Sequence, residues 1–239
     1  MKILNTKMKN NLPQWHDYDM GNGVIAFSTT RKGGCSEGNY AAFNINRYCG
    51  DDPAHIEANR TALCQRLGIG MAQLVVPHQV HAAEVKQIGR DFTEQPAVVR
   101  DELTDGFDAV MTDVPGICVG VSTADCIPVL IYDAAHHAVC AVHAGWRGTV
   151  QRIVVKAIER MRAAYGTQPS ELTAASMIFS VFVFISCCIF RGNFYTSGRF
   201  HKGRDRCVQL LEHPFQNLQE ASYPGVAGGW LLHVVAIQT

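Results

Sequence analysis

Four short apolar runs in the middle of the chain set the strongest limit on its fold. They cover residues 109–112, 117–122, 127–132 and 138–143, and a polar turn at 133–136 separates the last two. Each run is rich in β-branched and other apolar residues and has the length of a strand rather than a helix. The pattern therefore predicts that closely spaced strands form the core.

Helices are expected on both sides of these runs. Asp52 is a good N-cap, Pro53 suits a first helical turn, and apolar residues follow at near-helical spacing, which predicts a helix from Pro53 to about Leu67. Residues 149–161 repeat apolar side chains with a helical period, which predicts a second helix. Further strands are expected at 24–30, 74–76 and 80–88, with loops at 31–39 and 91–105.

Composition excludes some classes of protein. The chain has 239 residues, of which 21 are basic and 21 acidic, so its formal net charge is zero. A nucleic-acid binder normally carries a clustered excess of Lys and Arg, and none is present. The first residues lack the apolar core of a signal peptide, and the nine cysteines include no Cys-x-x-Cys pair. We therefore expect a cytoplasmic protein with reduced thiols that binds neither nucleic acid nor a membrane.

Three side chains suggest a metal site. Cys126 and His143 each lie at the edge of a predicted strand, and His81 lies in an upstream His-x-x-His pair. A thiolate and two imidazoles are the ligands that a catalytic zinc site with one open position uses. The alternative is that Cys126 is a core thiol and that each histidine forms local hydrogen bonds. The spacing alone leaves both interpretations open.

Charged neighbours have two interpretations as well. Asp125 is either an acceptor that orients an imidazole or a cap of a helix or turn. Arg147 follows Gly145-Trp146, so it either holds a phosphate or carboxylate or packs its stem on Trp146. The same alternatives apply to Arg31 in the glycine-rich loop. The usual glycine-rich nucleotide motifs and the Gly-x-Ser-x-Gly motif of hydrolases are absent.

Eight segments occur together in a characteristic order. They are Ser28-Thr-Thr-Arg-Lys-Gly-Gly34, Asn44-Ile-Asn46, Gly50-Asp-Asp-Pro53, Asn59-Arg60, Gln79-Val-His81, Asp108-Ala-Val-Met-Thr112, Thr123-Ala-Asp-Cys126-Ile-Pro-Val129 and His143-Ala-Gly-Trp-Arg-Gly148. In this order they resemble the polyphenol oxidase (laccase-domain) family, typified by YfiH and YlmD, over about residues 22–175. The last two segments are the most specific.

The resemblance implies a fold and a site. The fold is α/β (α+β), a mixed β-sandwich core flanked by helices, and it is also similar to that of cytotoxic necrotizing factor deamidases. The implied metal ligands are His81, Cys126 and His143, with Zn²⁺ as the metal and Cu²⁺ as an alternative. Cys126 and His143 are also candidate catalytic residues together with Asp125. Candidates for substrate or anion binding are Arg31, Asn44 and Arg147.

The resemblance also implies an activity. It is zinc-dependent phosphorolysis of adenosine, inosine and methylthioadenosine, with adenosine deaminase activity and copper-dependent polyphenol oxidase activity beside it. A purine nucleoside and phosphate are then the partners, and a homodimer is a compatible assembly. Two alternatives remain: a Cys–His amidase or deamidase acting on peptidoglycan precursors or protein, and a non-catalytic binding module.

The sequence changes character near residue 176. We expect one domain over residues 1–239, but 176–239 is atypical, beginning with a 15-residue apolar run that is short for a membrane span. The motifs with which family members continue are not recognisable there. We hypothesise that this segment comes from a frameshifted reading frame. Translation of the gene in its other two frames tests the idea, which fails if neither frame restores those motifs.

Overall fold

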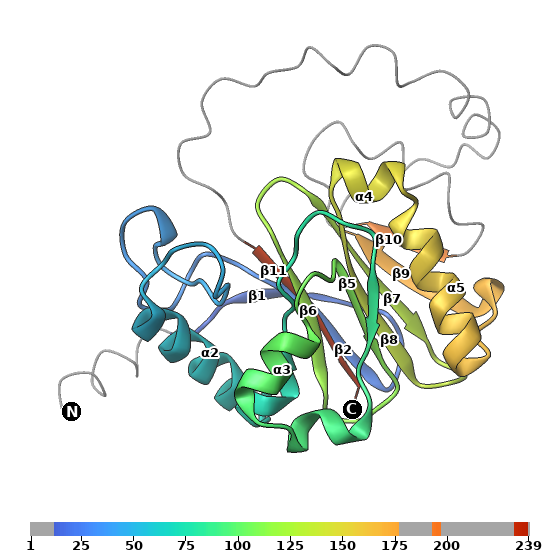
Figure 1. The fold of residues 1–239 in the computed structure, drawn as a ribbon, viewed down its shortest axis with the longest axis horizontal. Coiled ribbons are helices and arrows are strands. Elements are labelled where there is room, and N and C mark those ends of the chain that lie inside the picture. The colour runs from blue at the N-terminus through green and yellow to red at the C-terminus, as the bar shows by residue number, and fades with distance from the viewer. Residues whose placement is uncertain (1–11, 177–192, 197–231, 239) are drawn as a thin grey trace, which may run out of the picture.

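The computed structural model describes residues 12–176, 193–196 and 232–238, which form two sheets and the helices that cover them (Figure 1). The first sheet contains, in spatial order, β1 (Trp15–Tyr18), β2 (Val24–Thr29), β11 (Leu232–Gln238), β6 (Cys118–Thr123) and β3 (Leu74–Val75). The second contains β10 (Asn193–Thr196), β9 (Leu172–Ser176), β7 (Ile127–Asp133), β8 (Ala138–Ala144), β5 (Ala109–Thr112) and β4 (Val85–Gln87).

The helices lie between and after these strands. The α-helices of the described residues are α2 (Pro53–Leu67), α3 (Ala97–Leu103), α4 (Trp146–Val150) and α5 (Ile153–Tyr165). Short 3-10 turns occur at Gly38–Tyr40, Met71–Gln73, Arg90–Glu94 and Pro169–Glu171. Both sheets are mixed, because β3 pairs with β6, β4 with β5 and β10 with β9 in parallel, whereas the other pairs are antiparallel.

The two sheets pack face to face, and alternate residues of each strand point to opposite sides. Leu130 of β7 belongs to the same buried cluster as Val119 and Val121 of β6, between the sheets. Its neighbour Ile131 packs on the other side, in a cluster with Ile153 of α5. Since both faces of the second sheet are covered at its centre, β5, β7 and β8 are buried along almost their whole length, which explains three of the four apolar runs in the sequence.

The outer face of the first sheet is covered by α2. Leu63 and Cys64 of this helix pack in one cluster with Phe27 of β2 and Cys118 of β6. Figure 1 accordingly shows α2 and α5 on opposite sides of the paired sheets. The order helix, sheet, sheet, helix confirms the predicted mixed sandwich flanked by helices.

The prediction for α2 is confirmed, including its ends. The Asp52 carboxylate accepts a hydrogen bond of 2.8 Å from the Ala54 N–H, and Pro53 occupies the first turn. Gly68 ends the helix with a φ of 70°, a left-handed conformation that glycine adopts at little cost. Asp52 and Pro53 predicted the start of the helix correctly because both act within the helix itself.

The prediction of one helix over 149–161 is wrong. The segment forms α4 and α5, and the break between them falls at Gln151 and Arg152, where Arg152 has a φ of 60°. The apolar period runs through the break because Val150 matches it, yet Val150 is 53% exposed and contributes nothing to the core.

Two further predictions need correction. The strand expected at 80–88 is confined to Val85–Gln87, because the backbone N–H groups of residues 80–82 bond to a side chain instead of a neighbouring strand. The loop expected at 91–105 contains most of one 3-10 turn and the whole of α3. The apolar run at 176–190 lies outside the described residues except for Ser176, the last residue of β9.

Two connections cross from the first sheet to the second, and both do so at the same end. The chain passes from β3 to β4 and from β6 to β7. Since β3 and β6 are parallel, and β4 and β7 both enter the second sheet at the end where β8 finishes, the two connecting loops meet there.

In the described part of the chain, no helix has the length and apolar character to cross a membrane.

Leu130 tests the core between the sheets. It is fully buried, so Leu130→Ala should lower the free energy of unfolding by about 2–5 kcal/mol, because the cavity left behind cannot fully collapse. Urea denaturation measures this loss. Val98→Ala is the control, since Val98 is 68% exposed and its truncation should change stability by less than about 0.5 kcal/mol. Equal effects of the two changes would contradict the assigned core.

Candidate metal centre

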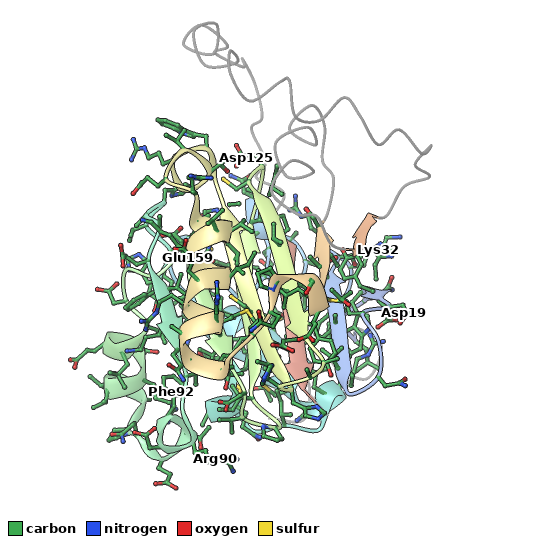
Figure 2. The ribbon with its side chains drawn as sticks, turned by 90° about the vertical axis from the view of Figure 1, so that its right-hand side faces the viewer. Asp19, Lys32, Arg90, Phe92, Asp125 and Glu159 are labelled. Atoms are coloured by element: carbon green, nitrogen blue, oxygen red, sulfur yellow. The ribbon has the colours of Figure 1, made fainter. Side chains whose placement is uncertain are left out.

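The strand register brings the predicted ligands together. Pro128 of β7 pairs with His143 of β8, so Cys126, in the bend just before β7, lies beside the end of β8. His81 lies in the loop that leads from the first sheet to β4. Figure 2 shows Asp125 of the same bend beyond the strand ends, opposite the end that carries Arg90.

The three side chains form a compact group. The ligand atoms of His81, Cys126 and His143 all lie within 4.8 Å of one another, and this is the group of such donors found among the described residues. The Cys126 Sγ is 3.9 Å from the His81 Nε2, and the two imidazoles meet edge to face with centroids 4.9 Å apart. His143 is buried, Cys126 is half-buried and His81 is exposed, so the group opens to solvent on one side.

The donor set and its spacing fit a metal ion. A tetrahedral zinc with bonds of about 2.0–2.3 Å holds its sulfur and nitrogen ligands about 3.5 Å apart, close to the spacing present. Gly145 provides room beside them. A Cβ at this position would lie 3.1 Å from the Cys126 Sγ, 3.1 Å from the His81 Cδ2 and 3.6 Å from the His143 Cε1. The missing side chain therefore leaves the space that all three ligands face.

A buried carboxylate, Asp108, supports both histidines. Its Oδ1 accepts a hydrogen bond of 2.7 Å from the His143 Nδ1, and the backbone N–H groups of Val80, His81 and Ala82 bond to its two oxygens. Burial alone raises the pKa of Asp108, but the hydrogen bonds from His143, Ala82 and Val80 outweigh it, and the pKa lies below its usual value. Asp108 is therefore ionised and can only accept.

The sequence analysis missed Asp108 and gave its role to Asp125. The available signal was a charged residue directly before the apolar run that becomes β5. Ala109 pairs with Val142, so the start of β5 lies beside the end of β8 and brings Asp108 to His143. Asp125 is exposed and lies next to Cys126 instead. A catalytic role for Asp125 stays a prediction.

The Cys126 thiol is protonated in the metal-free protein. Its pKa is raised to about 12, chiefly by burial and further by the neighbouring Asp125 and by Asp108. A thiol that acts as a nucleophile without a metal needs the opposite shift, normally from a cation within reach. A metal ion can supply the missing positive charge, because its binding displaces the proton from sulfur.

Side-chain hydrogen bonds to the backbone hold the two ligand loops against each other. The side-chain amide of Gln79 donates to the Ser122 carbonyl at 2.8 Å and accepts from the Ser122 N–H at 2.7 Å, as the backbone of a neighbouring strand would. The Thr123 hydroxyl donates to the Cys126 carbonyl and closes the bend. Gln79 therefore ties the His81 loop to the strand that precedes Cys126.

The predicted anion-binding residues Arg31 and Asn44 make contacts within their own loop. The Arg31 guanidinium donates to the carbonyls of Asn39 and Ala41, each at 2.8 Å. Asn44 is buried, and its amide donates to Asp51 at 2.8 Å. These bonds assign both side chains to the support of the loop, and their binding of an anion stays a prediction.

Arg147 lies four positions after His143 in the sequence and is exposed. Its guanidinium lies 5.3 Å from the centroid of the Trp146 ring. Arg147 therefore packs on Trp146, which is one of its two predicted roles. Trp146 itself is 65% exposed and directly follows Gly145. An exposed aromatic ring and an exposed cation thus directly follow the glycine that faces the three ligands.

Comparison with known proteins identifies a family and several relatives. The family described as multi-copper polyphenol oxidoreductase laccase matches residues 25–177. A purine nucleoside phosphorylase of Bacteroides thetaiotaomicron is 44% identical over 151 residues, which cover 63% of this chain and 56% of the relative. The adenosine deaminase RL5 of an unknown prokaryotic organism is 38% identical over 139 residues, covering 58% of this chain and 53% of RL5.

A solved structure has a similar fold. The crystal structure of YlmD from Geobacillus stearothermophilus matches with a TM-score of 0.62 and 27% identity, over 70% of this chain and 64% of YlmD. The chain spans just over half the length of the two curated relatives.

Gly145 tests the space beside the ligands. Its φ of −67° suits any residue, so Gly145→Ala adds only a Cβ, which must displace the Cys126 sulfur and the His81 ring by a few tenths of an ångström. We expect zinc affinity, measured by competition with a chromophoric chelator, to fall about tenfold or more. Gly70→Ala, at another ordinary φ and with a Cβ no closer than 3.4 Å to its neighbours, should leave the affinity unchanged. Unaltered zinc affinity in Gly145→Ala would contradict the inference that the metal ion needs the space at Gly145.

The raised thiol pKa predicts a dependence of metal binding on pH. Between about pH 7.5 and 9, Cys126 stays protonated in the metal-free protein, so each bound ion must release one proton from sulfur. Zinc affinity should therefore rise about tenfold for each pH unit. Chelator competition at several pH values measures the slope, and a flat profile would mean that the thiol is already ionised.

Proposed function

The chain belongs to the multi-copper polyphenol oxidoreductase laccase family, and on that basis we propose that it is a zinc-dependent purine nucleoside phosphorylase. The proposed substrates are adenosine, inosine or methylthioadenosine together with phosphate, and the products are the free base and the sugar 1-phosphate. Deamination of adenosine is a second proposed activity, which the similarity to the adenosine deaminase RL5 supports.

One observation carries the proposal: a thiol and two imidazoles converge with their ligand atoms within 4.8 Å at an open strand end. The residues of this group lie inside the matched region, and the two curated relatives described above are named as enzymes of nucleoside chemistry. A purely structural zinc site would normally have four protein ligands and be closed. Three ligands with an open side favour a catalytic site.

Each residue has a defined task in this proposal. A zinc ion with an open position polarises a bound oxygen or supplies hydroxide near neutral pH. His81, Cys126 and His143 would hold the ion, and Asp108 contacts His143 at Nδ1, the ring nitrogen that would not bind it. Phosphorolysis also needs the phosphate held beside the anomeric carbon. Arg147 is our candidate for that contact, because it is exposed and follows the glycine that faces the ligands.

Other activities fit the geometry less well. A metal-free Cys–His amidase needs a thiol that ionises readily, which the raised pKa of Cys126 opposes. Copper-dependent phenol oxidation of the multicopper kind needs several copper sites, whereas the described residues contain one group of three ligands. A single copper remains compatible with two histidines and a cysteine.

The C-terminal part bears on activity. The matched region ends at residue 177, near the change in composition, which supports our proposal that the following residues derive from a frameshift. If substrate binding needs the C-terminal motifs of other family members, which this chain lacks, the chain is a binding module without turnover. A thermal shift with inosine and phosphate separates an intact pocket from an altered one.

The proposal is tested with the zinc-loaded protein. We expect adenosine and phosphate to give ribose 1-phosphate in an amount equal to the sum of adenine and hypoxanthine, with hypoxanthine arising from the inosine that deamination forms. Chromatography follows all of them in one reaction. Cys126→Ala should lose bound zinc, measured by elemental analysis, together with both activities. A protein that binds one equivalent of zinc and forms none of these products would overturn the assignment to nucleosides.

A further inference from the structure

The loop that carries His81 has an unusual backbone. His81 has a φ of 60°, a left-handed conformation that is costly for a side chain of this size. As a result, the N–H groups of Val80, His81 and Ala82 all point to one place. Three successive N–H groups in such a turn form a concave site for an anion.

Here the anion belongs to the protein itself. The Asp108 carboxylate accepts these three N–H groups at 3.2, 3.0 and 2.7 Å, in the order of the chain. Asp108 is fully buried, so water cannot replace it. The carboxylate therefore holds the His81 backbone in a conformation that the loop would otherwise not favour.

The same carboxylate acts on the second histidine. Its Oδ1 accepts from the His143 Nδ1 at 2.7 Å, and the Asp108 carbonyl accepts from the His143 N–H at 2.7 Å. Both Asp108 oxygens already accept backbone N–H groups, so the carboxylate faces the His143 Nδ1 as an acceptor. This arrangement places the ring proton on Nδ1 and leaves Nε2 available to a metal ion. Neutral Nε2 is the form that binds a metal ion.

We propose that Asp108 is a positioning residue that sets both histidine ligands at once, the backbone of His81 and the tautomer of His143. The inference rests on the proposed metal-dependent function, but it concerns metal binding and not the choice of substrate. Asp108 would fix the affinity of the site without touching the ion.

An amide cannot replace the carboxylate, because the two sides of Asp108 both need an acceptor. In Asp108→Asn, one orientation places the amide NH₂ against the N–H groups of Val80 and Ala82. The other orientation places the NH₂ against both the His81 N–H and the His143 Nδ1, so that the ring proton must move to Nε2. Each orientation therefore disturbs at least one of the two histidines while the volume of the side chain stays the same.

Asp133 offers a matched control. It is also fully buried, accepts the N–H groups of Ala135 and His136 at 3.0 and 3.2 Å, and bonds to the His136 Nδ1 at 2.8 Å. It ends β7, whereas Cys126 precedes the first residue of that strand. Asp133→Asn removes a comparable buried network at the opposite end of β7, away from the three ligands.

The first measurement is metal affinity. We expect Asp108→Asn to weaken Zn²⁺ binding about 10–100-fold in chelator competition, and Asp133→Asn to leave it unchanged. Co²⁺ titration should give a thiolate charge-transfer band in all three proteins, with a changed ligand-field spectrum only in Asp108→Asn. Asp108→Glu keeps the charge and should recover part of the affinity. Equal Zn²⁺ affinity in Asp108→Asn and the unaltered protein would overturn the inference.

The second measurement needs neither metal nor substrate. Nitrogen NMR of ¹⁵N-histidine in the metal-free protein reports which ring nitrogen of His143 carries the proton, with His143→Gln to assign the signal. We expect Nδ1–H in the unaltered protein. Observation of Nε2–H there would overturn the inference even if Asp108→Asn does not fold.

These results separate the inference from the proposed function. A protein that binds zinc but forms no nucleoside products contradicts the proposed activity and leaves the role of Asp108 intact. If the protein is active but Asp108→Asn leaves its zinc affinity unchanged, the result contradicts only the inference about Asp108.

Discussion

The covering of the second sheet on both faces is the constraint on which the rest of the structure depends. The first sheet packs against its inner face and α5 against its outer face, so the strand interiors admit mainly apolar side chains. Polar chemistry is then restricted to the strand ends and the loops that join them. His143 illustrates the limit, because it lies one residue before the end of β8 on the face that also carries Val139 and Ala141.

The site combines a buried charge with a strained loop, and each compensates for the other. An isolated carboxylate as buried as Asp108 would be strongly destabilising, whereas three backbone donors and an imidazole make it favourable. The left-handed conformation of His81 is likewise costly on its own, and the carboxylate holds it. The network stabilises a geometry that faces solvent, in keeping with a site that must admit a ligand.

Local signals predicted much of the fold. The helix Pro53–Leu67 follows from an N-cap, a proline and apolar residues at near-helical spacing, all of which act within the helix. The strands follow from apolar runs whose cause is burial on both faces. The loop at residues 80–82 could not be predicted, because it depends on contacts with the distant Asp108. The break at Arg152 could not be predicted, because the apolar period continues through it at Val150. The ligand set came from the resemblance to a family, since residues 45 and 17 positions apart meet only through strand register.

The two crossings between the sheets give the ligand group a mechanical property. His81 and Cys126 lie in connections that leave the first sheet, whereas His143 is part of the second. Asp108 ties the His81 loop to the second sheet, and Gln79 ties the same loop to Ser122 of the first sheet, so a change in the packing of the two sheets would act on the position of His81. By thermodynamic reciprocity, a packing change deep between the sheets would alter how tightly the ion is held. Metal affinity in this fold would thus depend on how the two sheets pack against each other.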